Sequence, residues 1–160
     1  MADDSRKDKI MIVDDTPVNL KLLNEMLEDN RFSVHAFPRG DLALQAVPKI
    51  LPDLILLDIN MPGMNGYEVC ERLKKDPRLA EIPVIFISAL NETEDKVKGF
   101  SVGGVDYITK PFQLPEVLMR VNTHLELRRQ KTELIRNYAK LRELEQNRDD
   151  MVHMIAHDMR

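Results

Sequence analysis

Residues 54–66 read LILLDINMPGMNG, and this stretch decides the fold. Its first four residues are large aliphatics, which is typical of a strand buried on both faces in a parallel sheet covered by helices. Asp58 follows them directly, so the strand would carry a carboxylate to the edge where open α/β sheets bind their ligands. The stretch therefore predicts an α/β fold with Asp58 at a functional edge.

Three further predicted strands lead into polar or charged side chains, as the first one does. These side chains are Asp14 and Asp15 after residues 10–13, Ser88 after residues 84–87, and Lys110 shortly after residues 105–108. If the strands are neighbours, three carboxylates converge at one edge of the sheet. They could not all stay ionised there without a cation, so a hard divalent metal with oxygen ligands is implied.

The order and spacing of these motifs closely resemble the receiver domain of two-component response regulators, over roughly residues 8–125. The matching positions are Asp14, Asp15, Asp58, residues 61–66, Ser88, Tyr107, Lys110 and Pro111. The resemblance implies that Asp58 accepts a phosphoryl group and that Mg²⁺ is the metal. It further implies that Asp15, Asp58 and the backbone carbonyl of Asn60 bind Mg²⁺ directly, while Asp14 acts through metal-bound water.

The same resemblance assigns roles to the other matching residues. Lys110 would supply positive charge to the phosphoryl oxygens, and the Ser88 hydroxyl would donate a hydrogen bond to one of them. Tyr107 would rotate inward when Ser88 engages the phosphoryl group, although an ordinary strand aromatic packing on the last helix is the alternative. The Lys110–Pro111 peptide is implied to be cis, which costs little before proline.

Helical patterns lie between the predicted strands. Thr16 can cap a helix that has Pro17 at its first position, and Asn91 can cap another. A short helix over residues 41–47 is expected to end at Pro48. Strands that alternate with helices predict a (βα)5, flavodoxin-like, doubly wound parallel sheet.

The region after residue 125 has a different pattern. No Gly or Pro occurs from Glu116 to the end, so the fifth helix is expected to continue without a break. Two heptad positions form an apolar seam with polar interruptions: Leu127, Leu134, Leu141, Arg148 and Ile155 at one, and Asn137, Leu144 and Met151 at the other. This seam predicts a parallel coiled-coil homodimer. The alternative is a helix that folds back on its own domain.

Residues 148–160 carry a second resemblance, to the start of the dimerisation and phosphotransfer helix of histidine kinases. His157 would be the phosphoacceptor of that helix and Asp158 its partner in proton removal; a solvated histidine is the alternative. The chain would then be part of a receiver–histidine kinase hybrid whose ATP-binding domain follows Arg160. The predicted organisation is a disordered N-terminus (1–8), a receiver domain (9–125), a coiled-coil signalling helix (126–148) and the start of the phosphotransfer helix (149–160).

Composition limits the other possibilities. The 160 residues include one cysteine, Cys70, so an intrachain disulfide is excluded and a reducing, cytoplasmic location is expected. No apolar stretch approaches the ~20 residues of a membrane helix, and no signal sequence opens the chain, so no membrane partner is expected. The net charge of −4 argues weakly against a nucleic-acid partner. His35, His124 and His153 are interpreted as structural or solvated residues.

Three functions compete at this point. The first is a signalling module that is phosphorylated by an upstream histidine kinase or phosphotransfer protein and regulates an attached kinase. The second is a phosphatase-like hydrolase, but such enzymes place a second Asp two residues after the nucleophile, where this chain has Asn60. The third is a scaffold that only dimerises, which the intact set of three acids argues against. Whether this stretch is itself an enzyme stays open.

Overall fold

The computed structural model describes residues 6–89 and 93–158, except for the side chains of residues 93–95 and 155–158. Two compact units make up the chain, residues 1–125 and 126–160. The strands are β1 (Lys9–Val13), β2 (Ser33–Phe37), β3 (Leu54–Asp58), β4 (Val84–Ser88) and β5 (Asp106–Thr109). The helices are α1 (Pro17–Glu28), α2 (Gly40–Ile50), α3 (Gly66–Lys75), α4 (Thr93–Ser101) and α5 (Leu114–Asp158).

The five strands form one parallel sheet in the order β2-β1-β3-β4-β5, which confirms the predicted (βα)5 topology. Strands β3 and β4 are buried at every residue, as their continuous apolar runs predicted. The strand β2 lies at the edge of the sheet and is only partly buried.

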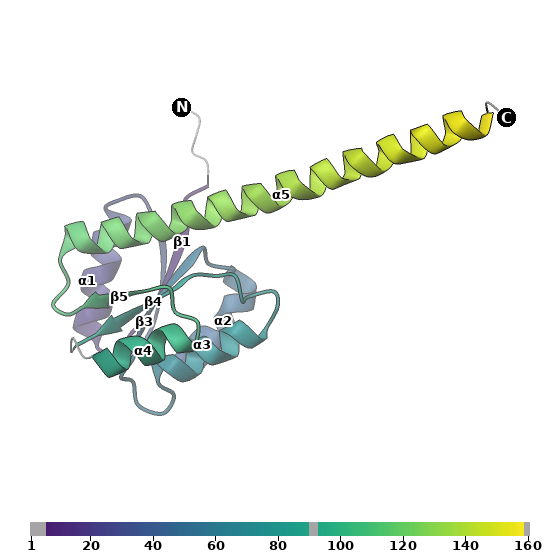
Figure 1. Ribbon diagram of the computed structural model, residues 1–160. Coiled ribbons are helices and arrows are strands. Elements are labelled where there is room, and N and C mark those ends of the chain that lie inside the picture. The colour runs from purple at the N-terminus through teal and green to yellow at the C-terminus, as the bar shows by residue number, and fades with distance from the viewer. Residues whose placement is uncertain (1–5, 90–92, 159–160) are drawn as a thin grey trace. The chain divides into compact units, whose positions relative to one another are not determined.

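Alternate residues of each central strand point to opposite faces and build two separate cores. Met11, Ile55, Leu57 and Phe86 join the core beneath α2 and α3. The opposite core is formed by the alternate strand residues, by α1 and by the first turns of α5, which Figure 1 shows on the side of the sheet away from α2 and α3. Its members are Ile10, Ile12, Leu23, Leu27, Phe32, Leu54, Leu56, Ile85, Ile87, Ile108, Val117, Val121 and Leu125. The helices on both faces leave only the strand ends and their loops for a polar site.

The predicted end of α2 at Pro48 was wrong. The helix continues to Ile50 with Pro48 inside it, and Leu51 follows in the left-handed region at φ 53°. Proline removes only its own backbone donor, and the amide of Leu51 still donates to the carbonyl of Val47 at 2.8 Å. The last turn therefore keeps enough hydrogen bonds to persist.

The two predicted helix caps have different outcomes. Thr16 is the residue before α1, but its side chain makes no capping hydrogen bond. Instead, Asp14 Oδ1 accepts a hydrogen bond from the Thr16 backbone N–H at 2.9 Å. Asn91 lies outside the described residues.

The helix α5 spans 45 residues without a break, which confirms the predicted long C-terminal helix. Its large apolar side chains beyond residue 125 that are exposed in this structure are Leu127, Leu134, Ile135, Tyr138, Leu141, Leu144, Met151, Val152 and Met154. In the described parts of the chain, no helix combines the length and apolarity needed to cross a membrane.

Candidate functional site

Three aspartates meet where β1 and β3 end. Asp58 is the last residue of β3, and Asp14 and Asp15 follow the neighbouring strand β1. Each of the three offers a carboxylate oxygen, and these oxygens all lie within 4.8 Å of one another. Such a set of carboxylate oxygens suits a hard divalent cation such as Mg²⁺. The structure therefore brings together the three acids that the sequence singled out.

The carboxylate of Asp14 is fully buried and held in place. It accepts hydrogen bonds from the backbone N–H of Thr16 and from Asn19 Nδ2, at 2.9 and 3.3 Å. These bonds fix one face of the cluster, so the negative charge of Asp14 stays next to Asp58.

Asp58 is 3% exposed. Burial, followed by the negative charge of Asp14, raises the pKa of Asp58 to about 7, while the charge of Lys110 and its hydrogen bond lower it. The ionised form of this carboxyl is thus unfavourable unless further positive charge is added. A bound cation would supply that charge.

Lys110 is the one cation that the described residues bring into contact with this acid cluster. Its Nζ lies 3.3 Å from Asp58 Oδ1 and 3.6 Å from Asp14 Oδ2. The Lys110–Pro111 peptide is cis, as the resemblance implied. The backbone N–H of Lys110 donates to the carbonyl of Ser88 at 2.8 Å, so the ends of β4 and β5 are joined beside the site.

The loop between β3 and α3 is fixed against Asp58 by Asn65 and Gly66. The Asn65 side chain accepts a hydrogen bond from the Glu68 backbone N–H at 3.0 Å, and Glu68 Oε1 accepts one from the Asn65 N–H at 3.3 Å. A Cβ on Gly66 would lie 2.3 Å from the backbone oxygen of Asp58. Sequence reasoning missed this capping box, although its Asn-x-x-Glu spacing is a recognised helix-start signal.

A family model supports the same interpretation over most of the chain. The model for the response regulator receiver domain matches residues 10–122. The chain belongs to this family. Its receiver domain thus contains the sheet, the acid cluster and the first turns of α5.

Among curated relatives of this receiver domain, a probable cyclic di-GMP phosphodiesterase from Vibrio cholerae is 40% identical over 126 residues, which cover 79% of this chain and 28% of the relative. The DNA-binding dual master transcriptional regulator RpaA from Synechocystis is 39% identical over 117 residues, covering 73% of this chain and 48% of RpaA. The chain thus spans half or less of either relative. A signal receiver domain of a signal transduction histidine kinase from Syntrophus aciditrophicus has a TM-score of 0.69 and 34% identity, covering 74% of this chain and 90% of that one.

Other predicted residues of the receiver domain lie around the acids. Ser88 is buried at the end of β4, the strand next to β3. Tyr107 on β5 is 7% exposed, and its ring centroid lies 6.2 Å from that of Phe100. Lys96 Nζ lies 5.6 Å from the centroid of the Tyr107 ring. Asn60 follows β3 by two residues, and the role of its carbonyl stays a prediction.

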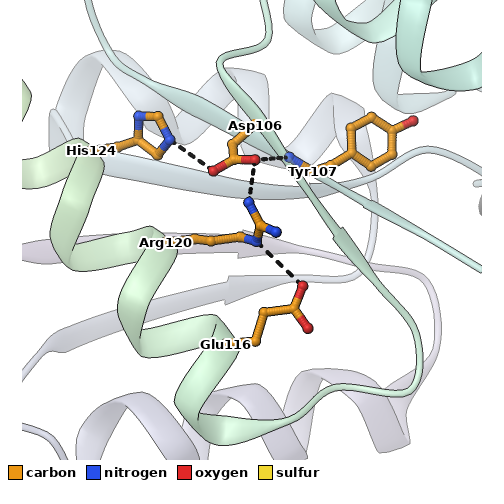
Figure 2. A network of polar contacts seen from close by, with 5 residues as sticks. All are labelled: Asp106, Tyr107, Glu116, Arg120 and His124. Atoms are coloured by element: carbon orange, nitrogen blue, oxygen red, sulfur yellow. Dashed lines mark hydrogen bonds and ion pairs between the residues drawn. The ribbon is translucent and has the colours of Figure 1, made fainter.

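A second polar cluster joins β5 to α5 within the receiver domain (Figure 2). Asp106 accepts hydrogen bonds from the Tyr107 backbone N–H at 2.9 Å and from Arg120 Nη1 at 2.7 Å, and its Oδ2 lies 2.9 Å from His124 Nε2. Arg120 Nε also donates to Glu116 Oε1 at 3.3 Å. Burial alone would raise the pKa of Asp106, but the bonds from Tyr107, His124 and Arg120 hold it below its ordinary value.

Sequence reasoning missed this cluster, because it interpreted His124 without assigning it a partner. The available signal was the four-residue spacing of Glu116, Arg120 and His124, which places them on one face of a helix. The predicted phosphoacceptor His157 and its neighbour Asp158 fall in the last turn of α5. Their side chains lie outside the part of the chain that the structure describes.

Proposed function

We propose that this receiver domain accepts a phosphoryl group on Asp58 in a Mg²⁺-dependent reaction, and that the change is signalled through α5 to an attached histidine kinase. The observation that carries the proposal is the buried Asp58 carboxylate, within 4.8 Å of two other carboxylates and 3.3 Å from Lys110 Nζ. This combination suits phosphoryl transfer, which needs positioning and charge neutralisation more than acid–base catalysis.

In the proposed reaction, an oxygen of Asp58 forms a bond to phosphorus while the bond between phosphorus and the donor's histidine nitrogen breaks. The product is an acyl phosphate on Asp58, and the released imidazole takes a proton from solvent. Lys110 and the Ser88 hydroxyl would bind the phosphoryl oxygens. The donor would be an upstream histidine kinase or a phosphotransfer protein.

The three acids fit the metal that the family resemblance implies. Asp15, Asp58 and the backbone carbonyl of Asn60 would be direct ligands, and Asp14 would act through metal-bound water. When bound, Mg²⁺ would offset the negative charge of the incoming phosphoryl group. The proximity of three carboxylate oxygens and the raised pKa of Asp58 both support a cation at this position.

The proposed organisation is a receiver domain over residues 9–125, a signalling helix over 126–148 and the start of a phosphotransfer helix over 149–160. The predicted N-terminal segment, residues 1–8, lies mostly outside the described residues. The exposed heptad seam of α5 supports a homodimer through this helix. The solved receiver domain of a histidine kinase supports the proposed kinase link. A buried, unpaired Cys70 supports a cytoplasmic location.

The expectation of no nucleic-acid partner gains no support from the comparisons. One relative that is 39% identical to this chain, RpaA, is named as a DNA-binding regulator, and the matched part covers 48% of RpaA. The absence of a nucleic-acid partner therefore stays a prediction. The hydrolase alternative requires a second Asp two residues after Asp58, and this chain has Asn60 at that position, which argues against it.

Phosphorylation by a small-molecule acyl phosphate tests the assignment of Asp58. With Mg²⁺ present, intact-mass measurement should show one hydroxylamine-sensitive phosphate per chain, and a chelator should abolish it. Asp58→Asn should prevent the modification, whereas Asp29→Asn, the same change on an exposed residue after α1, should leave it unaltered. Hydroxylamine-sensitive phosphate on the Asp58→Asn variant would refute the assignment.

The kinase link has a separate test in a protein that joins this chain to an ATP-binding domain. There, Asp58→Asn should alter the rate of autophosphorylation on His157 rather than abolish it. A rate in the variant that equals the rate in the natural protein, both before and after Asp58 of the natural protein is phosphorylated, would contradict signalling to the kinase.

A further inference from the structure

In the part of α5 beyond Leu125, charged side chains lie at the heptad positions on either side of the apolar seam. With Leu127 taken as position a of a heptad, Leu134 and Leu141 also occupy a, and Gln130, Asn137 and Leu144 occupy d. The leucine side chains are between 53% and 69% exposed in the single chain. Three consecutive heptads with charged flanking positions are long enough to indicate a coiled coil. Arg148 occupies the next a position, so the regular heptads are limited to residues 126–147.

Positions e and g flank such a seam and decide which helices pair and in which direction. Here g holds Glu126, Glu133 and Lys140, and e holds Lys131, Tyr138 and Glu145. In a parallel coil, a g residue faces the e residue that lies five positions later on the other helix. Glu126 would therefore face Lys131 of a second copy, and Lys140 would face Glu145. Two-fold symmetry repeats each opposite-charge pair.

The polar residues of the seam favour the same arrangement. In a parallel pair in register, each d residue meets its own equivalent, so Asn137 meets Asn137 and the two amides can hydrogen bond to each other. In an antiparallel pair, a faces d, and Asn137 would lie against Leu134 or Leu141. An amide buried against leucine without a partner is unfavourable.

We infer that residues 126–147 form a parallel, in-register, two-stranded coil with a second copy of this chain, and that Lys140 and Glu145 fix its register across the interface. The inference rests on the homodimer included in the proposed function, which the seam already predicted to be parallel, and adds its register and the two residues that fix it. Lys140 and Glu145 are five residues apart, so they do not face each other within one helix. A dependence of one on the other would thus report contact between two copies.

A charge exchange in the full 160-residue chain tests this pairing by sedimentation equilibrium at low salt. Lys140→Glu and Glu145→Lys should each raise the dimer Kd about tenfold, because each replaces two attractive contacts by two repulsive ones. The double variant should return Kd to within about threefold of the natural chain, because its pairs are again opposite in charge. Glu143→Lys makes the same change at position c, outside the interface. It meets Lys140 only within its own helix, so it should change Kd much less than either single variant. Circular dichroism on each variant would establish that the helix is retained.

The possible failures are distinguishable. In the antiparallel registers that keep leucines in the seam, Lys140 faces Glu133 or its own equivalent, and Glu145 does not face Lys140. A double variant that dimerises no better than the single ones would then overturn the parallel register while leaving the dimer. A natural chain that is monomeric at tens of micromolar would overturn the dimer as well. Phosphorylation of Asp58, measured on the same samples, reports on the proposed function independently of either result.

Discussion

Asp58 shows how the neighbours of one residue set its charge. Burial and the carboxylate of Asp14 raise its pKa to about 7, and Lys110 at 3.3 Å offsets only part of that effect. Close, buried like charges oppose folding when both are ionised, so the pair of Asp14 and Asp58 is destabilising in the absence of a cation. A ligand that binds only the folded state increases its stability.

We therefore expect Asp58→Asn to remove most of the effect of metal on stability. Without metal at pH 8, the variant should have the higher Tm, because one of the repelling charges is gone. Its free energy of unfolding should be higher by about 1–3 kcal/mol. Added Mg²⁺ should raise the Tm of the natural chain by several degrees and that of the variant much less. Calorimetry with and without a chelator measures both. An equal Mg²⁺ effect on the two proteins would place the cation elsewhere.

At the scale of elements, Asp106, the first residue of β5, connects this strand to two side chains of α5, Arg120 and His124. Its bonds to Tyr107, His124 and Arg120 outweigh the effect of burial and lower its pKa. A carboxyl whose pKa is lower in the folded state stabilises the fold above its unfolded pKa of about 3.9, and this contribution is lost as the pH falls through the folded value.

The pH dependence of unfolding should reveal this contribution. At pH 7 Asp106→Asn should lower the free energy of unfolding by about 1–3 kcal/mol, because the charge-assisted bonds to Arg120 and His124 weaken. The difference from the natural chain should shrink as the pH falls below about 4. Urea unfolding from pH 3 to pH 8 measures it, with Asp29→Asn as the exposed control. A difference that does not change with pH would show that the carboxylate charge has no part in the stabilisation.

The strand ends, the contact between β5 and α5, and the end of α2 show what the sequence could and could not predict. The strand ends at Asp14, Asp58 and Ser88 were predictable, because continuous apolar runs and parallel topology are local patterns with one common outcome. The cluster around Asp106 depends on how α5 packs over β5, so residues 14 and 18 positions apart meet only in the fold. The persistence of α2 beyond Pro48 likewise depends on the next turn, which propensity alone does not capture.

At the scale of the whole molecule, the two compact units should be separable. Residues 1–125 contain the sheet and both cores, whereas the helix beyond them exposes its apolar side chains in the single chain. A chain that ends at Leu125 should therefore stay folded and monomeric, and the 160-residue chain should be a dimer. Sedimentation velocity at tens of micromolar distinguishes them. A dimer of the shorter chain would place the interface on the receiver domain.

The three tyrosines of the chain are distributed among different surroundings. Tyr67 packs against Phe86 in the core with ring centroids 5.5 Å apart, Tyr107 is buried on β5, and Tyr138 is 61% exposed on α5. Fluorotyrosine incorporation would give three ¹⁹F resonances, one for the core, one for β5 and one for the helix. A single spectrum could then follow a chemical event at Asp58 in three parts of the molecule at once.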